Sequence, residues 1–362
     1  MQGHGTIVRR AHTDSSAKIG AIEPLARGDR EHLEDRELAP GATRAHGSGH
    51  RERVEEPDPL RTCFERDRDR ILHSAAFRRL AGKTQVFISP EDHQRTRLTH
   101  ALEVAQVATG IARACRLNVA LAEAIALGHD CGHGPFGHAS EDAFMPYIDG
   151  GFDHAVWGAD VVLGPLNLCA ETLDGVRNHS WSRPAPATPE GEVVSWADRI
   201  AYVCHDFEDA VRAGIVTPEM LPEVVHDRCG ARRGDQLGAF IQDVIETTCV
   251  QGEVGTSSPM AEALAAFRAF DYEHIYMRPA SVAQGDAVIK VARALVELFA
   301  DRPNTMPLDA SATTDGGLLA GSPEALHAAV SYVAGMTDRF AFAQAVARLG
   351  WDRSAVPEGL AG

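Results

Sequence analysis

The chain has 362 residues, a formal net charge of −16 at pH 7, 44% hydrophobic residues and 6% aromatic residues. This acidic balance argues against a protein whose main task is non-specific nucleic-acid binding, which needs clustered Lys and Arg. No segment approaches the roughly 20 apolar residues that span a bilayer, and the seven cysteines form no C-x-x-C pair. We therefore expect a cytoplasmic protein with reduced thiols and no membrane association.

The beginning of the chain differs in composition from the rest. It is rich in Gly, His, Arg, Asp and Glu, and its apolar residues are too sparse to cover a core. The sequence predicts a disordered leader over residues 1–57, a folded domain over residues 58–350 and a tail over residues 351–362.

Hydrophobic periodicity predicts helices through the folded domain. Apolar residues recur at three- and four-residue steps in Leu98–Arg116, and an Ala- and Leu-rich run ends at Gly128, a typical helix stop. Pro184–Glu190 has the composition of a loop. No run of β-alternation is present, so the expected class is all-α. The other expected helices are Val119–Gly128, Val193–Ala213, Gly238–Thr247, Val282–Ala300, Pro323–Phe340 and Ala341–Leu349.

The helix expected over Val193–Ala213 carries two different faces. An apolar stripe runs from Ile200 to Val211, while Asp198, Tyr202 and Asp206 recur at four-residue steps on another face. This polar stripe contains Tyr and His among its acids and no lysine. We interpret it as the wall of a cleft.

Histidine and aspartate side chains are the candidate metal ligands, and they come from three predicted helices or helix ends. Mixed imidazole and carboxylate ligation suits Mn²⁺, Fe²⁺, Ni²⁺ or Zn²⁺ and tolerates Mg²⁺. The pattern H…HD…D alone is loose, but His129–His138 holds three histidines, one acid, three glycines and a proline in ten positions. An ordinary helix interior does not have this composition. The predicted ligands are His100, His129, Asp130 and Asp198.

Longer motifs carry a family resemblance over about Leu60 to Leu349. They are Arg66–Ile71, His73–Leu80, Lys83–Phe87, Asp92–His93, Thr96–His100, His129–Glu141, Gly151–His154, Asp198–Tyr202 and Ala334–Arg339. In these motifs the chain resembles the bacterial dGTPase branch of the HD-domain deoxynucleoside triphosphate (dNTP) triphosphohydrolases. The resemblance implies an HD-type helical fold with extra C-terminal helices, and hydrolysis of dGTP or another dNTP to deoxynucleoside and inorganic triphosphate.

The same resemblance implies a cofactor, an assembly and residue roles. The cofactor is a divalent metal ion, with Mn²⁺ or Mg²⁺ favoured over Fe, Ni, Co or Zn, and the assembly is a homo-oligomer such as a hexamer. His100, His129, Asp130 and Asp198 match the metal ligands. His154 with Glu141 matches the catalytic His–carboxylate pair, and His133 and His138 match pocket histidines near the phosphates. The residues that match substrate contacts are Gln85 for the sugar, Arg97 and Arg199 for the phosphates, and Tyr202 and Asp206 for the deoxyribose.

These roles agree with general chemistry. A metal ion and Arg97 would neutralise charge on the phosphate oxygens. A histidine held by a carboxylate, as expected for His154 and Glu141, can protonate the departing 5′-oxygen. A tyrosine ring at Tyr202, close under the sugar, would leave no room for a 2′-hydroxyl.

The chain departs from the family pattern at a few positions. Asp153 and Ala155 stand where the family commonly has Glu and Asn, and Ser140 stands where Gly is frequent. None of these departures removes a predicted metal ligand. His179 and His205 stay outside the predicted site, because a lone histidine is more often packed or solvated.

Two alternative functions remain open. The first is an HD phosphohydrolase acting on a nucleoside monophosphate, a cyclic nucleotide or an alarmone, which would not need Gln85, Arg97, Tyr202 and Asp206 together. The second is a non-catalytic regulator that binds nucleotides or single-stranded nucleic acid, which would not need the His154–Glu141 pair.

Overall fold

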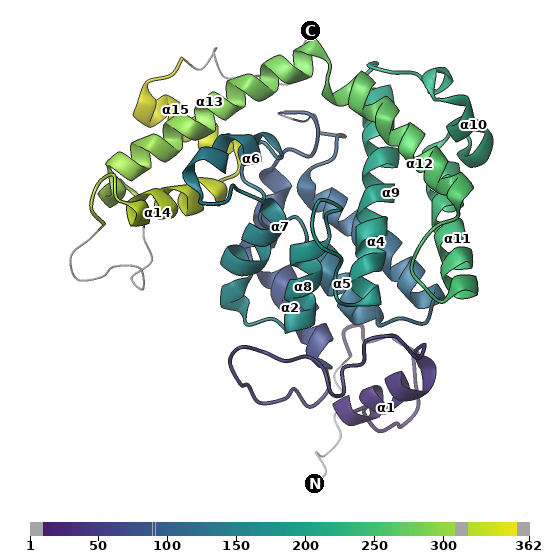
Figure 1. Ribbon diagram of the computed structural model, residues 1–362. Coiled ribbons are helices and arrows are strands. Elements are labelled where there is room, and N and C mark those ends of the chain that lie inside the picture. The colour runs from purple at the N-terminus through teal and green to yellow at the C-terminus, as the bar shows by residue number, and fades with distance from the viewer. Residues whose placement is uncertain (1–9, 89, 91, 308–317, 353–362) are drawn as a thin grey trace.

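Helices make up the architecture of the computed structural model, which describes residues 10–88, 90, 92–307 and 318–352 (Figure 1). Within these residues there is no strand, only two isolated bridges, Arg51–Cys169 and Thr84–Thr96. The predicted all-α class is therefore confirmed. No described helix is both long enough and apolar enough to cross a membrane.

The helices follow in this order along the described chain: α1 (Arg27–Glu37), α2 (Cys63–His73), α3 (Ala75–Arg79), η1 (Leu80–Gly82), α4 (Arg97–Ala114), α5 (Val119–Gly128), α6 (Ala139–Phe144), η2 (Met145–Tyr147), α7 (His154–Trp157), η3 (Gly158–Val162), η4 (Gly164–Leu166), α8 (Ala170–Asn178), α9 (Pro189–Arg212), η5 (Pro218–Met220), α10 (Glu223–Cys229), α11 (Arg233–Gln251), α12 (Ser258–Asp271), η6 (Tyr272–Tyr276), α13 (Pro279–Asp301), η7 (Pro303–Thr305), α14 (Pro323–Ala334) and α15 (Asp338–Leu349).

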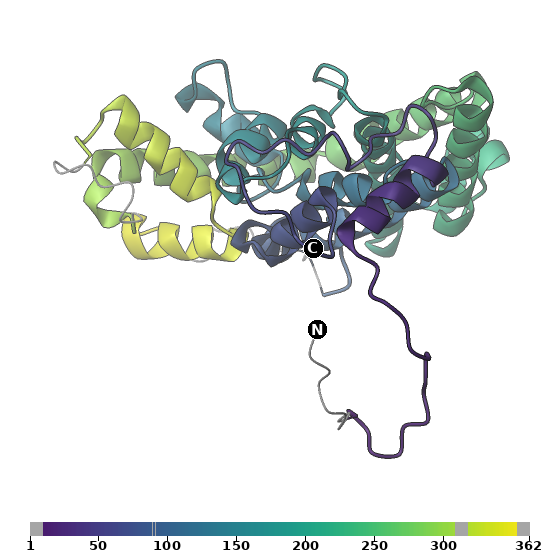
Figure 2. The ribbon, with the colours of Figure 1, turned by 90° about the horizontal axis from the view of Figure 1, so that it is seen from below.

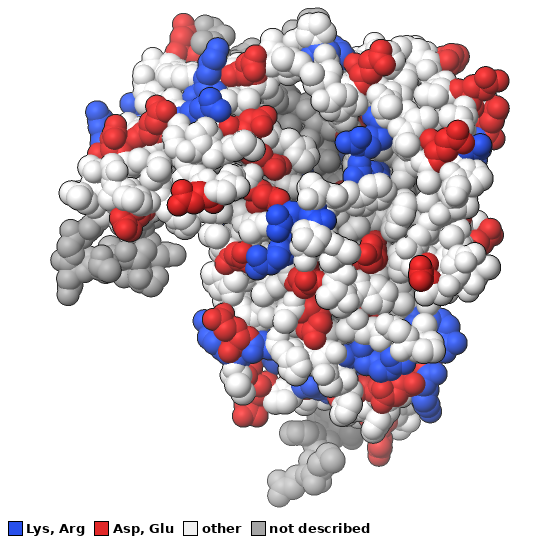
Figure 3. Space-filling view, in the orientation of Figure 1, with Lys and Arg blue, Asp and Glu red and all other residues white. Residues whose placement is uncertain are grey.

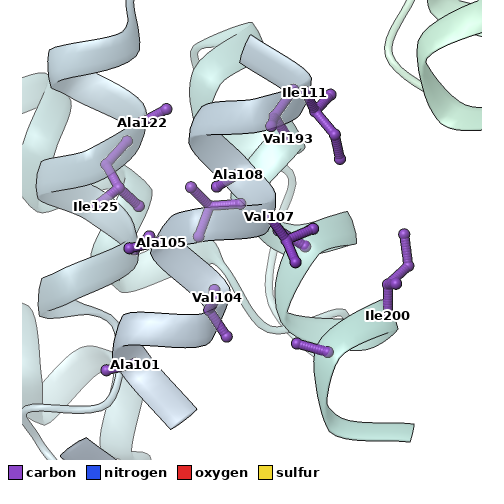
Figure 4. Close-up of a cluster of buried hydrophobic side chains, with 14 of the residues drawn as sticks. Ala101, Val104, Ala105, Val107, Ala108, Ile111, Ala122, Ile125, Val193 and Ile200 are labelled. Atoms are coloured by element: carbon purple, nitrogen blue, oxygen red, sulfur yellow. The ribbon is translucent and has the colours of Figure 1, made fainter. Parts of the chain in front are cut away.

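Helices α4, α5 and α9 pack together at the centre of the molecule (Figures 1 and 4). Ala101 and Ala108 on α4 and Ala122 on α5 are fully buried, and such small side chains let neighbouring helices approach closely. Ile125 and Ile200 belong to the same buried apolar cluster (Figure 4). His100 lies on α4, Asp198 lies on α9, and His129 and Asp130 directly follow α5. The packing of these three helices therefore fixes the relative positions of the four predicted metal ligands.

Helix α9 begins one turn earlier than the sequence suggests. The hydroxyl of Thr188 accepts a hydrogen bond from the backbone N–H of Gly191 (3.1 Å), and Pro189 occupies the first turn. Both features are favourable at a helix start. The expected loop therefore ends at Thr188.

A second core joins the C-terminal helices to α6. Val288 and Leu295 on α13 pack with Val330 on α14 and Ala341 on α15, and Figure 1 shows α14 and α15 beside α13. The helix expected over Pro323–Phe340 ends instead at Ala334. A new helix then begins at Asp338, because the hydroxyl of Thr337 caps its first turn.

The predicted disordered leader is wrong for the segment that follows residue 26. Residues 10–25 extend away from the body (Figure 2), but α1 and the segment after it pack onto the domain. The side chain of Glu34 accepts from the backbone N–H of Ala45 (2.6 Å), and the carboxylate of Glu190 accepts from the hydroxyl of Thr43 (2.7 Å). Arg51 pairs with the buried Asp67 at 2.6 Å. Polar contacts hold this segment, so its low hydrophobicity misled the prediction.

The predicted leader and tail are described only in part. Residues 1–9 of the predicted leader and residues 353–362 of the predicted tail lie outside the described residues.

Candidate active site

A cavity of about 720 Å³ opens between α4, α9 and the segment from α12 to α13. Its lining includes Arg97 and His100 at the start of α4, Asp130 after α5, and Asp198 on α9. The predicted cleft wall on α9 therefore does face a cavity. Figure 3 shows acidic and basic side chains interspersed over one face of the molecule, without a continuous basic surface there.

The four predicted metal ligands converge at one side of this cavity. The Nε2 atom of His100 lies 3.0 Å from Oδ1 of Asp198, and Nε2 of His129 lies 3.7 Å from the same oxygen and 3.6 Å from Oδ1 of Asp130. His100, His129 and Asp130 are buried. Ligand atoms of His100, His129 and Asp130 lie within 4.8 Å of one another, and those of His129, His179 and Asp198 form a second such group. His129 belongs to both groups and therefore lies between the two carboxylates.

Hydrogen bonding shows that the pocket suits a cation. The carbonyl of Ala126 can only accept, so its 2.6 Å contact makes Nδ1 of His129 the protonated ring nitrogen. The other nitrogen, Nε2, then carries a lone pair; it is buried and has no hydrogen-bond partner among the described residues. A lone pair facing the oxygens of Asp130 and Asp198 is unfavourable unless a positive charge lies between them. The donor set therefore fits a divalent metal ion.

The charges of the neighbouring groups hold both carboxylates in their ionised form. Burial alone would raise the pKa of Asp198, but the hydrogen bond with His100 lowers it below its usual range. Burial also opposes ionisation of Asp130, while the charge of Arg97 brings its pKa well below the usual value.

Close backbone packing brings His154 to this site. A Cβ atom added at Gly132 would lie 2.0 Å from the carbonyl oxygen of His154 and 2.4 Å from the backbone nitrogen of Gly158. Only glycine permits this approach. The turn after α5 therefore lies directly against α7, and Nε2 of His154 comes within 3.9 Å of Oδ1 of Asp130.

His154 and Glu141 form the predicted pair. Nδ1 of His154 lies 2.9 Å from Oε1 of Glu141, and His138 contacts the same oxygen at 2.8 Å. Burial would lower the pKa of His154, but Glu141 raises it above the ordinary value.

His179 contacts the second ring nitrogen of His154, Nε2. Nδ1 of His179 donates to the carbonyl of Val176 (2.8 Å), and burial lowers the pKa of His179 to about 4. Its free Nε2 is therefore an acceptor, so His154 donates through Nε2 across 3.3 Å. With Nδ1 facing Glu141 and Nε2 facing His179, each ring nitrogen of His154 has an acceptor for a proton.

His133 and His138 occupy different environments. His138 lines the cavity with a side chain that is 73% exposed. His133 lies behind the wall; its ring stacks on His154 at 3.8 Å and its Nε2 lies 3.1 Å from Oδ1 of Asp130. The structure thus differs from the expected pocket position of His133, which contacts two site residues from behind.

Arg97 and Gln85 both line the cavity. NH1 of Arg97 pairs with Oδ2 of Asp130 at 2.6 Å, and its Nε donates to the carbonyl of Thr84. The NH2 group of Arg97 and the side-chain oxygen of Gln85 are buried and have no partner among the described residues. Both predicted contacts therefore keep hydrogen-bonding capacity for a ligand.

The remaining predicted contacts meet side chains from the opposite wall. The hydroxyl of Tyr202 accepts from NH1 of Arg199 (2.7 Å) and from Nε of Arg268 (3.1 Å). The hydroxyl of Tyr276 donates to Oδ2 of Asp206 at 2.5 Å. Burial raises the pKa of Asp206 to about 7.

Four cavity residues were missed by the sequence analysis. His179 ends α8, and Trp181 follows it with its ring 4.1 Å from the guanidinium of Arg199. Arg268 and Tyr276 come from α12 and η6, where no helix was expected. The adjacent sequence Asn178–Trp181 was a weak signal for the first two, whereas nothing local distinguishes Arg268.

Comparisons with known proteins agree with this arrangement. Residues 97–203 match the family model described as HD domain, and residues 254–346 match the phosphohydrolase-associated domain. The first match contains the four converging ligands, and the second contains Arg268 and Tyr276.

Similar proteins share most of the chain's length. A deoxyguanosinetriphosphate triphosphohydrolase-like protein of Caldanaerobacter subterraneus is 43% identical, over 86% of this chain and 92% of the relative. A protein of the same description from Desulfatibacillum aliphaticivorans is 41% identical, over 86% and 95%. Among solved structures, a hypothetical protein from Aquifex aeolicus is similar in fold, with a TM-score of 0.50 and 17% identity, over 80% of this chain and 69% of that one.

Proposed function

Because this chain belongs to the deoxyguanosinetriphosphate triphosphohydrolase-like proteins of the HD phosphohydrolase family, we propose that it hydrolyses dNTPs to deoxynucleoside and inorganic triphosphate. The reaction depends on a divalent metal ion, for which Mn²⁺ or Mg²⁺ is the first choice and Fe, Ni, Co or Zn the alternatives. One observation carries the proposal: His100, Asp130, Asp198 and His154 line one cavity, with His129 behind the first three and Glu141 beside His154.

The four converging side chains would hold the metal ion. When bound, the ion supplies neutralisation of phosphate charge and a lowered pKa for coordinated water. Arg97 adds positive charge beside Asp130, and its unpartnered NH2 group is available to a phosphate oxygen.

His154 is the proposed general acid. Glu141 orients its ring and favours the imidazolium, and its Nε2 atom lies 3.9 Å from Oδ1 of Asp130. Transfer of the Nε2 proton to the 5′-oxygen would release the deoxynucleoside. His138 shares the oxygen of Glu141, so it helps to hold the carboxylate, while His133 supports the ring of His154 from behind.

The α9 wall supports selection of the sugar. Two arginines fix the hydroxyl of Tyr202, so its ring cannot turn away to admit a 2′-hydroxyl. Asp206 and Gln85 are the proposed partners of the 3′-hydroxyl and the sugar, and Arg199 is a phosphate contact. Steady-state rates with dGTP and GTP test this step, and equal kcat/KM for both would refute the role of Tyr202.

The reaction itself is tested by product analysis. Metal-free protein is incubated with each of the four dNTPs and Mn²⁺ or Mg²⁺, and phosphorus NMR identifies the released anion. Inorganic triphosphate supports the proposal. Release of monophosphate or pyrophosphate would instead favour a different HD phosphohydrolase, and nucleotide binding without turnover would favour a regulator.

Assembly and location belong to the same proposal. We expect a cytoplasmic homo-oligomer, with a hexamer as the first candidate, and light scattering of the purified protein measures the assembly. All seven cysteines are free, which agrees with a reducing compartment.

A further inference from the structure

A second cavity lies between α3, η3 and the C-terminal end of α14, with a volume of about 340 Å³. Its polar lining includes Arg79, Lys83, Ser74 and Ser331. Among the residues that the structure describes, no Asp or Glu lines it. The chain as a whole has a net charge of −16, so a cavity lined by two basic side chains and no carboxylate departs from its average composition.

Lys83 forms the buried part of this cavity. Only 3% of its surface is exposed, and its ammonium group donates to the carbonyls of His133 and Ala334. An ammonium group has three donors, and the third has no acceptor within the described chain. Burial and, to a smaller extent, the nearby charge of Arg79 lower the pKa of Lys83 to about 7, against the opposing effect of Asp338. A bound anion would favour the ammonium form.

Arg79 stands at the exposed mouth of the cavity. Its guanidinium makes no hydrogen bond or ion pair with any residue in the described ranges, whereas neighbouring Arg78 donates to the carbonyl of His73. The nearest carboxylate to Lys83, Asp338, is already bonded to Thr84 and to the backbone N–H of Phe136. The cavity thus offers a planar guanidinium and an ammonium donor without a protein anion.

We propose that this cavity binds the phosphate group of a small anion, with Arg79 donating from the mouth and Lys83 from the floor. Guanidinium and ammonium groups form short, charge-assisted hydrogen bonds with phosphate oxygens. A volume near the lower end of the range for ligand pockets suits inorganic phosphate or a small phosphorylated molecule. The site is separate from the active-site cavity and does not depend on the proposed function.

Lys83 connects this site to the active site. One of its acceptors is the carbonyl of His133, whose ring stacks on His154. A bound phosphate that draws the ammonium of Lys83 toward itself loosens this contact. We therefore expect occupancy of the second cavity to change the turnover catalysed in the first.

Calorimetry with metal-free protein tests the binding site. Inorganic phosphate is titrated into the wild type, Arg79→Ala, Ser331→Glu and the matched control Arg78→Ala. The wild type and Arg78→Ala should bind with the same Kd, Arg79→Ala should bind at least about tenfold more weakly, and Ser331→Glu should abolish this binding. No phosphate binding by the wild type, or equal binding by the wild type and Arg79→Ala, would overturn the proposal.

A parallel titration with dGMP distinguishes a site for inorganic phosphate from a site for a phosphorylated molecule. Equal Arg79-dependent affinity for phosphate and dGMP assigns recognition to the phosphate alone, whereas tighter Arg79-dependent binding of dGMP assigns it to a phosphorylated molecule.

A second readout tests the connection and rests on the proposed function. Phosphate should change dNTP turnover at least twofold more in the wild type than in Arg79→Ala. An equal effect in both would refute the connection through Lys83, while the calorimetry decides the site independently of turnover.

Discussion

The two walls of the active-site cavity are built differently. On the α4, α5 and α9 side, His100, His129 and Asp198 project from helices whose apolar faces form the central core. On the α12 to α13 side, Arg268 and Tyr276 reach across to Tyr202 and Asp206 through polar contacts. Apolar packing holds both walls, since Phe267, Phe270 and Ile275 belong to the same core. Hydrogen bonds that span the cavity additionally position the side chains of the proposed recognition wall.

The largest loss of turnover is expected from a substitution in the proposed metal-binding wall. Asp198→Asn keeps the side-chain shape but removes the negative charge of a proposed ligand, so turnover should fall by about 10³-fold or more, equivalent to several kcal/mol. The metal content of the purified protein should fall in parallel, while the helical circular dichroism should persist. Asp142→Asn is the matched control, because Asp142 is an exposed acid that lines the same cavity. Full metal content in Asp198→Asn would contradict the assignment.

The proposed general acid gives the next largest effect. His154→Gln should lower kcat by about 10²- to 10⁴-fold and leave the metal content unchanged. Glu141→Gln should keep part of the activity but shift its pH dependence. Glu141 raises the pKa of His154, and the acid is active while protonated, so the alkaline limb of the kcat profile should move to lower pH. An unmoved limb would show that Glu141 does not control His154.

Substitutions in the proposed recognition wall should have a smaller effect, and they should change KM more than kcat. Tyr276→Phe removes the hydroxyl that donates to Asp206, and losing a hydrogen bond to a charged group costs about 1.5–3 kcal/mol. We expect KM to rise about tenfold or somewhat more, with a smaller change in kcat and unchanged metal content. Tyr272→Phe serves as the control, since Tyr272 lines the cavity but is 53% exposed. A loss of metal in Tyr276→Phe would show that the walls are not independent.

The smallest effect concerns the pH dependence of stability. Burial raises the pKa of Asp206 to about 7, so the folded protein binds this proton more tightly than the unfolded chain does. The contribution of Asp206 to stability is complete below the unfolded pKa and is lost as pH rises toward 7. Relative to Asp206→Asn, the wild type should therefore lose about 1 kcal/mol of unfolding free energy per pH unit between pH 5 and 6.5. Denaturant titrations measure this difference, and a constant difference would refute the raised pKa.

The contrast between the walls also explains what the sequence could predict. The ligands His100, His129, Asp130 and Asp198 lie in or beside helices with clear apolar periodicity, so both their helices and their shared site could be inferred. Arg268 and Tyr276 carry no local motif, and they become site residues only because α12 and η6 fold back against α9. Sequence periodicity does not report such long-range polar contacts.

The N-terminal segment shows the same limit. Glu34, Thr43 and Arg51 attach it to the domain through hydrogen bonds and an ion pair, none of which raises its hydrophobicity. His179 was missed for a different reason: its ring is a buried acceptor whose importance depends on the position of His154. Composition alone does not separate such a residue from an ordinary packed histidine.

Anomalous diffraction from crystals of the Mn²⁺-loaded protein tests the central claim most directly. The convergence of two imidazoles and two carboxylates predicts one strong peak within bonding distance of His100, His129, Asp130 and Asp198. A fully loaded protein whose manganese lies elsewhere, with none of these four side chains bound to it, would contradict this claim.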